Sequence, residues 1–304
     1  MFAFSIFMAN SVKDIYRFLS PKFQTVHLDY PVQAVPRYSK QNPIPVLNEI
    51  FVSGNERYSS LLEKFKNYVD DFSAWKYEQE NPQTPYWNNS FFPGLDMISL
   101  YSIIAEYKPK RYMEVGSGNS TKVAFSAKSK HSQQTKITSI DPMPRAEIDQ
   151  LADEVIRQPL EKTDLSIFKS LEKGDILFID NSHRCFPNSD VTVVFLEILP
   201  QLKSGVIVHV HDIYLPYDYP QFMTERFYNE QYVLAAMIAA NPQRYKTLMP
   251  CFYVSETADL AAKLNPVWQK LDNRIEKHGG SYWLEISLTP ALSKGEGDKA
   301  AEYK

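Results

Sequence analysis

The segment Arg111–Val115, followed at once by Gly116, Ser117 and Gly118, constrains this chain more than any other feature. Five residues of strand character run into a turn with two glycines, and the polar residues after it open a helical stretch. A strand, a glycine turn and a helix N-terminus form the nucleotide-binding corner of an open α/β sheet, because glycines let a ligand approach the backbone closely. Many turns carry two glycines for packing alone, so the motif needs support from other residues.

From Lys110 onward, short apolar strands alternate with helical stretches, which is typical of βαβ units on a mostly parallel sheet. We therefore predict a Rossmann-like, doubly wound α/β fold with a mostly parallel seven-stranded sheet. The predicted strands are Arg111–Val115, Lys136–Ile140, Glu154–Arg157, Asp175–Ile179, Val206–Val210, Lys246–Met249 and Tyr282–Leu288. The predicted helices between and after them are Ser120–Lys130, Ala146–Leu151, Asp164–Leu171, Asp190–Leu202 with Asp190 as N-cap, and Glu225–Ala240.

The residues before this sheet are expected to form a helical cap. Apolar residues recur at spacings of three and four between Glu56 and Glu80, which predicts one amphipathic helix. A loop rich in Pro, Asn and aromatic residues leads to a second helix near Leu95. We expect a helical and loop cap over residues 1–105, a nucleotide-binding domain over 106–288 and a disordered tail over 289–304.

Charge and cysteine content narrow the class of partner. The chain has 33 basic and 36 acidic residues and a formal net charge of −3, which predicts no nucleic-acid surface. The apolar start MFAFSIFMANS breaks after about nine residues, too short for a membrane span, and is expected to be a packed or frayed terminus. Cys185 and Cys251 lie far apart in the sequence, which favours a reducing cytoplasm. We expect a small-molecule partner and leave the oligomeric state open, a homodimer included.

Two acidic residues support a nucleotide site and narrow its ligand. Asp141 ends the second predicted strand, where a carboxylate can accept hydrogen bonds from the ribose hydroxyls, although it is also a good turn residue. Glu114 lies two residues before Gly116, so it would oppose the pyrophosphate of a dinucleotide but attract the sulfonium and ammonium of S-adenosylmethionine. Thr121 stands in place of a third glycine, which also disfavours a nicotinamide oxidoreductase.

Four strings then carry a family resemblance. EVGSGNST, TSIDP, GDILFIDNSH and GVIVHVHDIYLP, in this order, resemble successive motifs of class I S-adenosylmethionine-dependent methyltransferases. They are most similar to the bacterial small-molecule branch, and NEQYVLAAMIAANP resembles a helix of an uncharacterised subgroup. The resemblance covers about Trp87 to Tyr253. The strings say little about the acceptor, and our hypothesis is methyl transfer to an oxygen, or less favourably a nitrogen, of a small metabolite or sugar-like precursor.

The same resemblance assigns residues to the cofactor. Glu114 and the glycine turn would line its methionine part, Asp141 would hold the ribose, and Leu160 in the loop 158–161 would pack on the adenine. Asp180 would stand beside the transferred methyl group. The full cofactor-binding set is Glu114, Gly116, Ser117, Gly118, Asp141, Leu160 and Asp180.

The catalytic candidates follow the fourth and fifth predicted strands. Because ligands bind outside the carboxyl ends of parallel strands, Asp180, His183, His211 and Asp212 are expected to converge in one crevice. Deprotonating the acceptor is the main chemical task, and a histidine titrating between about pH 6 and 8 is the natural base. His183 or His211 would be that base, with Asp212 orienting one of them, whereas His209 inside its strand is expected to be a core residue.

Two rival functions remain open. A divalent metal could be held by Asp180, His211 and Asp212, as in a metal-dependent, hydroxylase-like relative, although a histidine in such a site disfavours Mg²⁺. The chain could also bind the cofactor without catalysis. Seven aromatic residues are expected either to wall an acceptor pocket or to seal loops over the sheet: Tyr86, Trp87, Phe91, Phe92, Tyr214, Tyr217 and Tyr219. The polar residues Asn88, Asn89 and Asp96 have no assigned role.

Overall fold

The computed structural model describes residues 15–16, 18–20, 26, 28–144 and 147–288. By its internal contacts the chain forms two units, Met1–Val35 and Pro36–Lys304, and the rest of this section concerns the second. The predicted features of the first eleven residues and of residues 289–304 lie outside the described residues. The domain boundaries expected at 105 and 288 stay predictions. Within the described part of the chain, no helix is long and apolar enough to cross a membrane.

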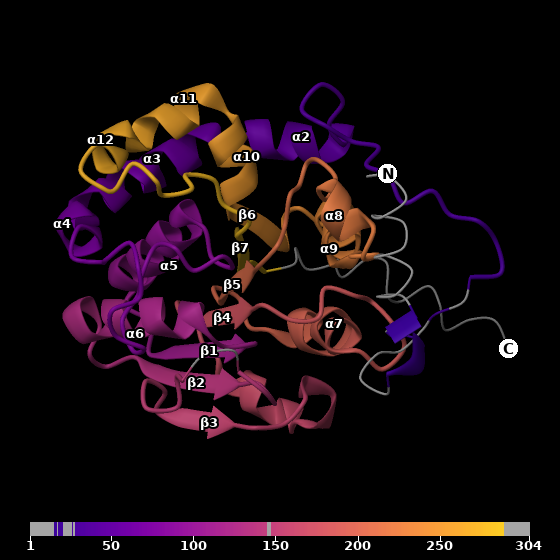
Figure 1. The fold of residues 1–304 in the computed structure, drawn as a ribbon, viewed down its shortest axis with the longest axis horizontal. Helices are drawn as coiled ribbons and strands as arrows, with labels where there is room; N and C mark the ends of the chain where they lie inside the picture. The colour runs from indigo at the N-terminus through magenta and orange to yellow at the C-terminus, as the bar shows by residue number, and fades with distance from the viewer. Residues whose placement is uncertain (1–14, 17, 21–25, 27, 145–146, 289–304) are drawn as a thin grey trace, which may run out of the picture. The chain divides into compact units, whose positions relative to one another are not determined.

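A seven-stranded sheet forms the centre of the second unit, in the order β3-β2-β1-β4-β5-β7-β6 (Figure 1). β1 to β5 pair in parallel, and β7 is antiparallel to both β5 and β6. The predicted mostly parallel sheet is confirmed, and each predicted strand lies within two residues of an observed one. The strands are β1 (Arg111–Val115), β2 (Lys136–Ile140), β3 (Glu154–Ile156), β4 (Ile176–Ile179), β5 (Ile207–Val210), β6 (Tyr245–Pro250) and β7 (Tyr282–Ile286).

The strand order reverses between β1 and β4, and this reversal places the site. From β1 the chain proceeds outward to β2 and β3, then crosses back to β4 on the other side of β1. Loops leaving the carboxyl ends of β1 and β4 therefore diverge and open a crevice. Every residue of β4 and β5 is buried, as expected for central parallel strands covered on both faces.

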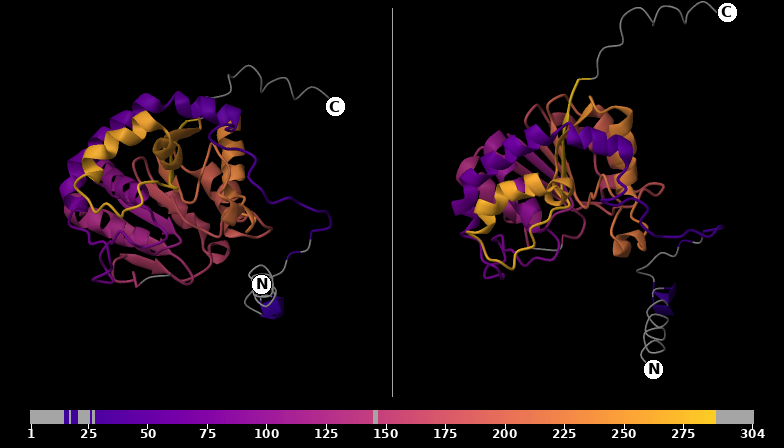
Figure 2. Two further views of the ribbon diagram at one scale, coloured as in Figure 1. Left: turned by 45° about the horizontal axis from the view of Figure 1, so that its top comes forward. Right: turned by 90° about the horizontal axis from the view of Figure 1, so that it is seen from above.

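Helices surround the sheet, and segments distant in sequence pack together at its β6 end. The first part of this unit, with α3, lies beside the last helical part, with α11 (Figures 1 and 2). The helices are α2 (Pro45–Val52), α3 (Asn55–Phe65), α4 (Val69–Phe72), α5 (Gly94–Tyr107), α6 (Asn119–His131), α7 (Asp190–Val193), α8 (Gln221–Thr224), α9 (Glu230–Ala240), α10 (Cys251–Glu256), α11 (Ala258–Ala261) and α12 (Asn265–Trp268). Short 3-10 turns lie at Lys66–Tyr68, Leu160–Lys162, Leu165–Ser170, Leu199–Gln201 and Ala262–Leu264, and a π turn lies at Val194–Ile198.

The single helix predicted over Glu56–Glu80 is wrong. α3 ends at Phe65, and the helical part ends at Phe72 after a 3-10 turn. Asp71 accounts for the change of direction, because its carboxylate accepts a hydrogen bond from Tyr101 on α5 (2.9 Å) and contacts His131 at the end of α6 (2.7 Å). Apolar residues keep recurring at helical spacings beyond the turn because both segments pack against the same core.

Four other helix predictions also need correction. Ser189 and not Asp190 caps α7, because its Oγ accepts the Thr192 amide hydrogen (3.2 Å). The helix predicted from Glu225 begins at Glu230, after the separate short α8. Residues 164–171 form a 3-10 turn capped by Asp164, and the described residues 147–151 form no helix.

Candidate active site

The glycine turn after β1 touches the end of β4. The Asp180 amide donates to the Val115 carbonyl (2.8 Å), which joins the two strand ends. Gly116 has a φ of +79°, and a Cβ added there would lie 1.7 Å from the Asp180 carbonyl oxygen. A Cβ added at Gly118 would meet no described atom within 4 Å. Gly116 is therefore required by close packing, whereas Gly118 leaves open space above the turn.

A cavity of about 410 Å³ lies at this turn; we refer to it as the small cavity. The turn and the start of α6 supply backbone amides at a helix N-terminus, where polar ligand groups bind readily. Asp180 closes the side nearest to β4. The small cavity is lined mainly by Tyr86, Phe91, Phe92, Ser117, Gly118, Asn119, Ser120 and Asp180.

Glu114 lies beneath the small cavity and is fully buried. Its carboxyl group accepts hydrogen bonds from Thr121 Oγ1 (2.5 Å), Tyr112 OH (3.3 Å) and Ser120 Oγ (3.3 Å). Burial raises the pKa of Glu114 to about 8, against the opposing effect of the three hydroxyl groups. The side chain is therefore protonated in the free protein at neutral pH, and its expected attraction for a cation requires that this proton leave.

The other expected cofactor residues lie near the small cavity without lining it. Asp141 supports the glycine turn, since its Oδ2 accepts the Ser117 amide hydrogen (2.8 Å) and its Oδ1 that of Met143 (2.7 Å). Leu160 is buried in its 3-10 turn. The ribose and adenine assignments of Asp141 and Leu160 stay predictions.

A larger cavity of about 950 Å³, the large cavity, opens beside the carboxyl ends of β4 and β5. Phe91, Phe92 and Asp180 line both cavities, so the two meet there. Of the seven aromatic residues singled out in the sequence, Tyr86 lines the small cavity. The large cavity is lined by the other six, Trp87, Phe91, Phe92, Tyr214, Tyr217 and Tyr219.

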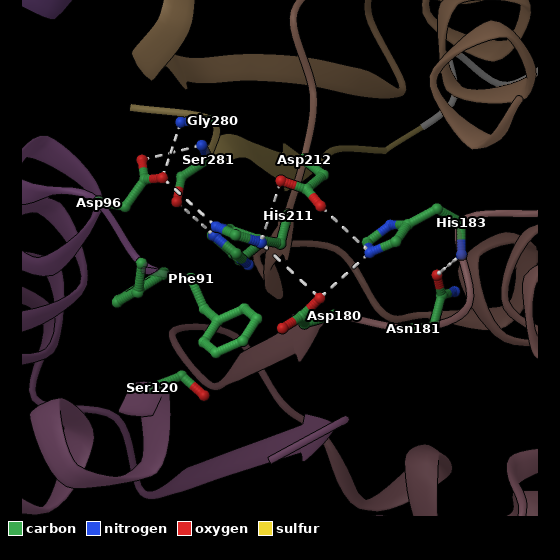
Figure 3. A network of polar contacts seen from close by, with 12 residues as sticks. Phe91, Asp96, Ser120, Asp180, Asn181, His183, His211, Asp212, Gly280 and Ser281 are labelled. Atoms are coloured by element: carbon green, nitrogen blue, oxygen red, sulfur yellow. Dashed lines mark hydrogen bonds and ion pairs between the residues drawn. The ribbon is translucent and has the colours of Figure 1, made fainter. Parts of the chain in front are cut away.

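The four catalytic candidates converge in the wall of the large cavity (Figure 3). His183 Nε2 lies 3.4 Å from Asp180 Oδ1 and 3.3 Å from Asp212 Oδ2. His211 Nδ1 lies 3.7 Å from a carboxylate oxygen of each aspartate. The two histidines are buried, whereas the side chains of Asp180 and Asp212 keep 30% and 21% of their surface exposed. All four residues line the cavity, and the aspartates are the more exposed of them.

Two further carboxylates pair with the outer sides of the histidines. Glu230 Oε2 lies 3.0 Å from His183 Nδ1, and Asp96 Oδ2 lies 3.4 Å from His211 Nε2. Both are fully buried. We refer to this alternation of acid and histidine as the charge row: Glu230, His183, Asp180 with Asp212, His211 and Asp96.

The charge row shifts the pKa of each histidine upward. Burial lowers the pKa of His183, but Asp180, Glu230 and Asp212 outweigh it and raise the value to about 10. Burial likewise opposes the charge on His211, and Asp212, Asp180 and Asp96 together hold its pKa well above the ordinary range. Burial would raise the pKa of Asp180, yet the two histidines hold it well below the usual range. Both histidines are therefore protonated in the free protein at neutral pH.

The backbone at the row is strained as well. His183 and Asp212 have φ values of 59° and 54°, in the left-handed region that residues other than glycine seldom adopt. The His183 carbonyl accepts the amide hydrogens of Asn229 (3.0 Å) and Glu230 (3.3 Å) at the start of α9. Such strain persists only where surrounding contacts hold it, and it is common at functional sites.

The sequence missed part of this arrangement. Glu230 stood inside a predicted helix with no role, and Asp96 was a polar candidate without an assignment. The one available signal was an acid in an otherwise apolar stretch. His209 behaves as expected for a core residue, since it is fully buried, stacks on Phe178 (3.9 Å between ring centroids) and contacts Ser281 Oγ (2.7 Å). Among the described residues, no group of three or more His, Cys, Asp or Glu side chains is arranged to hold a metal ion.

Residues 113–213 match a protein-family model described as a methyltransferase domain. The match runs from β1 to the end of β5 and includes the glycine turn, Asp141, Asp180, His183 and Asp212. The region from β1 to the end of β5 therefore matches a methyltransferase domain. The methyltransferase resemblance of the four sequence strings is thereby confirmed over these residues, and S-adenosylmethionine is the cofactor that it implies. The open space above Gly118 and the carboxyl group of Glu114 beneath it fit such a ligand.

Individual relatives are more distant. An uncharacterised protein of Archaeoglobus fulgidus is 33% identical over 122 residues, which make up 38% of this chain and 55% of that protein. The chain thus spans about half the length of this relative. The SAH-bound methyltransferase PaMTH1 of Podospora anserina is 14% identical, with 63% of this chain and 78% of that one covered and a TM-score of 0.39. The plantazolicin methyltransferase BpumL with SAH is 12% identical, covering 80% of this chain and all (100%) of that one, with a TM-score of 0.40. Likeness this weak adds nothing to the family match.

The two glycines of the methyltransferase turn should respond differently to one added methyl group. Gly116→Ala should lower the free energy of unfolding by roughly 3 kcal/mol or more, because the Cβ meets the Asp180 carbonyl at a left-handed φ. Gly118→Ala should stay within about 1 kcal/mol of the unchanged protein and weaken S-adenosylmethionine binding instead. Urea denaturation and calorimetry would measure both, and equal destabilisation by the two variants would contradict this account.

Glu114 should make stability depend on pH. Its pKa is raised from 4.5 to about 8 in the folded protein, so folding favours the protonated form and stability falls as pH rises between these values. Glu114→Gln has no such proton to lose. Over this window, the difference in unfolding free energy between the variant and the unchanged protein should therefore change in favour of the variant by up to about 1.4 kcal/mol per pH unit. Urea denaturation from pH 5 to 8 tests this, with the exposed Glu80→Gln as control. A difference independent of pH would show that Glu114 is ionised.

Proposed function

We propose that this protein transfers the methyl group of S-adenosylmethionine to an oxygen atom of a small metabolite, with His183 as the base. The observation that carries the proposal is that the small and large cavities meet at Asp180, Phe91 and Phe92. A cofactor in the small cavity and an acceptor in the large one would be neighbours across Asp180. The expected cytoplasmic location and small-molecule partner belong to the same proposal.

Each residue of the site has a defined part in this reaction. When bound, S-adenosylmethionine supplies an activated methyl group, whose transfer breaks the carbon–sulfur bond and leaves the electron pair on sulfur. The aromatic walls exclude water and orient the acceptor. His183 takes the acceptor hydroxyl proton at Nε2, the nitrogen that faces Asp180 and Asp212. The two aspartates then stabilise the imidazolium.

His211 is the weaker candidate for the base. Its Nε2 points to the fully buried Asp96, and its ring lies 5.3 Å from that of Phe92. Its Nδ1 contacts both aspartates at 3.7 Å. We therefore assign His211 the role of holding Asp180 and Asp212 in place.

The high pKa of His183 changes the pH dependence expected from the sequence. A midpoint between 6 and 8 is too low, because three carboxylates hold the proton on His183 in the free protein. The positive charge of a bound sulfonium opposes the imidazolium, so the midpoint in the cofactor complex should lie below that of the free protein. A base of raised pKa is stronger when neutral, which favours a weakly acidic acceptor such as a hydroxyl group.

Cofactor identity can be tested without the acceptor. S-adenosylmethionine at about a hundredfold excess over its Kd should raise the melting temperature by about 5 to 10 °C, whereas NAD should not. Asp141→Ala should abolish the shift, because Asp141 supports the Ser117 amide of the turn. Labelled S-adenosylmethionine incubated with a cell extract should then yield a methylated small molecule by mass spectrometry. Stabilisation by NAD alone would exclude the proposal.

The proposed base can be tested by activity. His183→Ala should bind S-adenosylmethionine almost normally and lose about 10²- to 10⁴-fold in rate. For the unchanged enzyme, kcat/KM should rise about tenfold per unit from pH 7 to 9, since the neutral fraction of His183 grows in that proportion below a pKa of about 10.

The metal-dependent rival makes the opposite prediction for chelation. Under the proposed mechanism, EDTA leaves the rate unchanged. Loss of turnover in EDTA, restored by Mg²⁺ or Mn²⁺, would instead assign Asp180, His211 and Asp212 as metal ligands.

A further inference from the structure

Glu230 is a buried carboxylate that the matched methyltransferase domain does not include. It is the first residue of α9 and lies outside the matched residues 113–213. Its exposed fraction is 0%, and its Oε2 lies 3.0 Å from His183 Nδ1. A buried carboxylate is costly unless a partner compensates it. His183 hydrogen-bonds to Glu230, so the two side chains form one unit.

The start of α9 also holds the backbone of His183. The Asn229 and Glu230 amides both donate to the His183 carbonyl, and Asn229 Oδ1 accepts the Cys185 amide hydrogen (2.6 Å). These contacts keep His183 at its left-handed φ of 59°. The loop after β4 and the start of α9 are therefore joined by backbone and side-chain hydrogen bonds.

The ring of His183 is held on three sides. Glu230 contacts Nδ1, Asp180 and Asp212 contact Nε2, and the Tyr228 ring stacks on the imidazole with 4.9 Å between centroids. Beyond Tyr228, the guanidinium groups of Arg184 and Arg226 lie 4.9 and 4.6 Å from its ring centroid. The negative charge of Asp190 also acts on the Glu230 carboxyl group, and the side chain of Asn181 lies close to it.

We propose that Glu230 is the positioning residue of His183: it keeps the proton on Nδ1, so that Nε2 is the nitrogen that accepts the acceptor's proton. Carboxylates accept only and face both ring nitrogens, but Glu230 lies closer to Nδ1 (3.0 Å) than Asp180 and Asp212 lie to Nε2 (3.4 and 3.3 Å), so its contact favours the Nδ1–H form of the neutral ring. With the proton on Nε2 instead, the nitrogen facing the large cavity would be a donor and could not act as a base. This role rests on the proposed function of His183.

The first test is the nitrogen that titrates, which needs no activity. In protein labelled with ¹⁵N-histidine, the His183 signals can be assigned by their loss in His183→Ala. We expect the Nδ1 proton to remain from pH 6 to above 10 while Nε2 loses its own. Loss of the Nδ1 proton, with Nε2 remaining protonated, would overturn the proposal even if the protein transferred no methyl group.

The second test compares three substitutions of glutamates. Glu230→Gln keeps the shape but offers an amide that can donate to Nδ1; the equivalent change in a serine-protease triad traps the wrong tautomer. We expect the initial rate of labelled-methyl transfer to the small-molecule fraction of a cell extract to fall at least about 10²-fold. Calorimetric affinity for S-adenosylmethionine should stay within roughly threefold, because Glu230 does not line the small cavity.

Two matched variants separate positioning from structural damage. Glu230→Asp retains the carboxylate and should recover at least about tenfold of the lost rate. Glu225→Gln makes the same chemical change at an exposed residue of the same segment and should leave the rate unchanged. An equal loss of rate in Glu225→Gln would overturn the role of Glu230. So would a Glu230→Gln variant that keeps the Nδ1 proton and the rate of the unchanged protein. Absence of turnover in the unchanged protein would instead contradict the proposed function.

Discussion

The position of Asp180 is the constraint on which the rest of the site depends. Its amide joins the end of β4 to Val115, and its carbonyl lies where any side chain at Gly116 would have to go. Its carboxylate contacts His183 and His211 and lines both cavities. The glycine turn, the strand order and the catalytic groups therefore share one residue, and displacing it would disturb all three.

The charge row explains how so many ionisable groups can be buried together. Acids and histidines alternate, so each buried charge has an opposite neighbour, which compensates for its loss of hydration. The outer acids sit at helix starts, Glu230 at the first residue of α9 and Asp96 in the first turn of α5, where negative charge is favoured. Asp96 also accepts the amide hydrogens of Gly280 (2.7 Å) and Ser281 (2.9 Å).

The antiparallel strand β7 completes the site for a topological reason. Because β7 runs opposite to β5, its first residue, Tyr282, pairs with Val210 at the carboxyl end of β5. The residues just before β7 therefore reach the same edge as the catalytic loops. A parallel strand in that place would have presented its carboxyl end there, and the amides that bind Asp96 would have lain at the opposite edge.

The sequence by itself determined the features with a local cause. Apolar runs predicted the seven strands, and their alternation with helices predicted the mostly parallel sheet. The crevice was predicted because Asp180, His183, His211 and Asp212 follow strand ends. Only the tertiary structure decided four other features: the break of the helix at Phe72, the start of α9 at Glu230, the protonated state of Glu114 and the raised pKa of His183. Each depends on burial or on a partner far along the chain: Asp71 meets Tyr101 and His131, and His183 meets a carboxylate 47 residues away. Hydrogen bonding and desolvation at such distances leave no periodic pattern in the sequence, which is why local reasoning located the proposed base but missed the residue proposed to orient it.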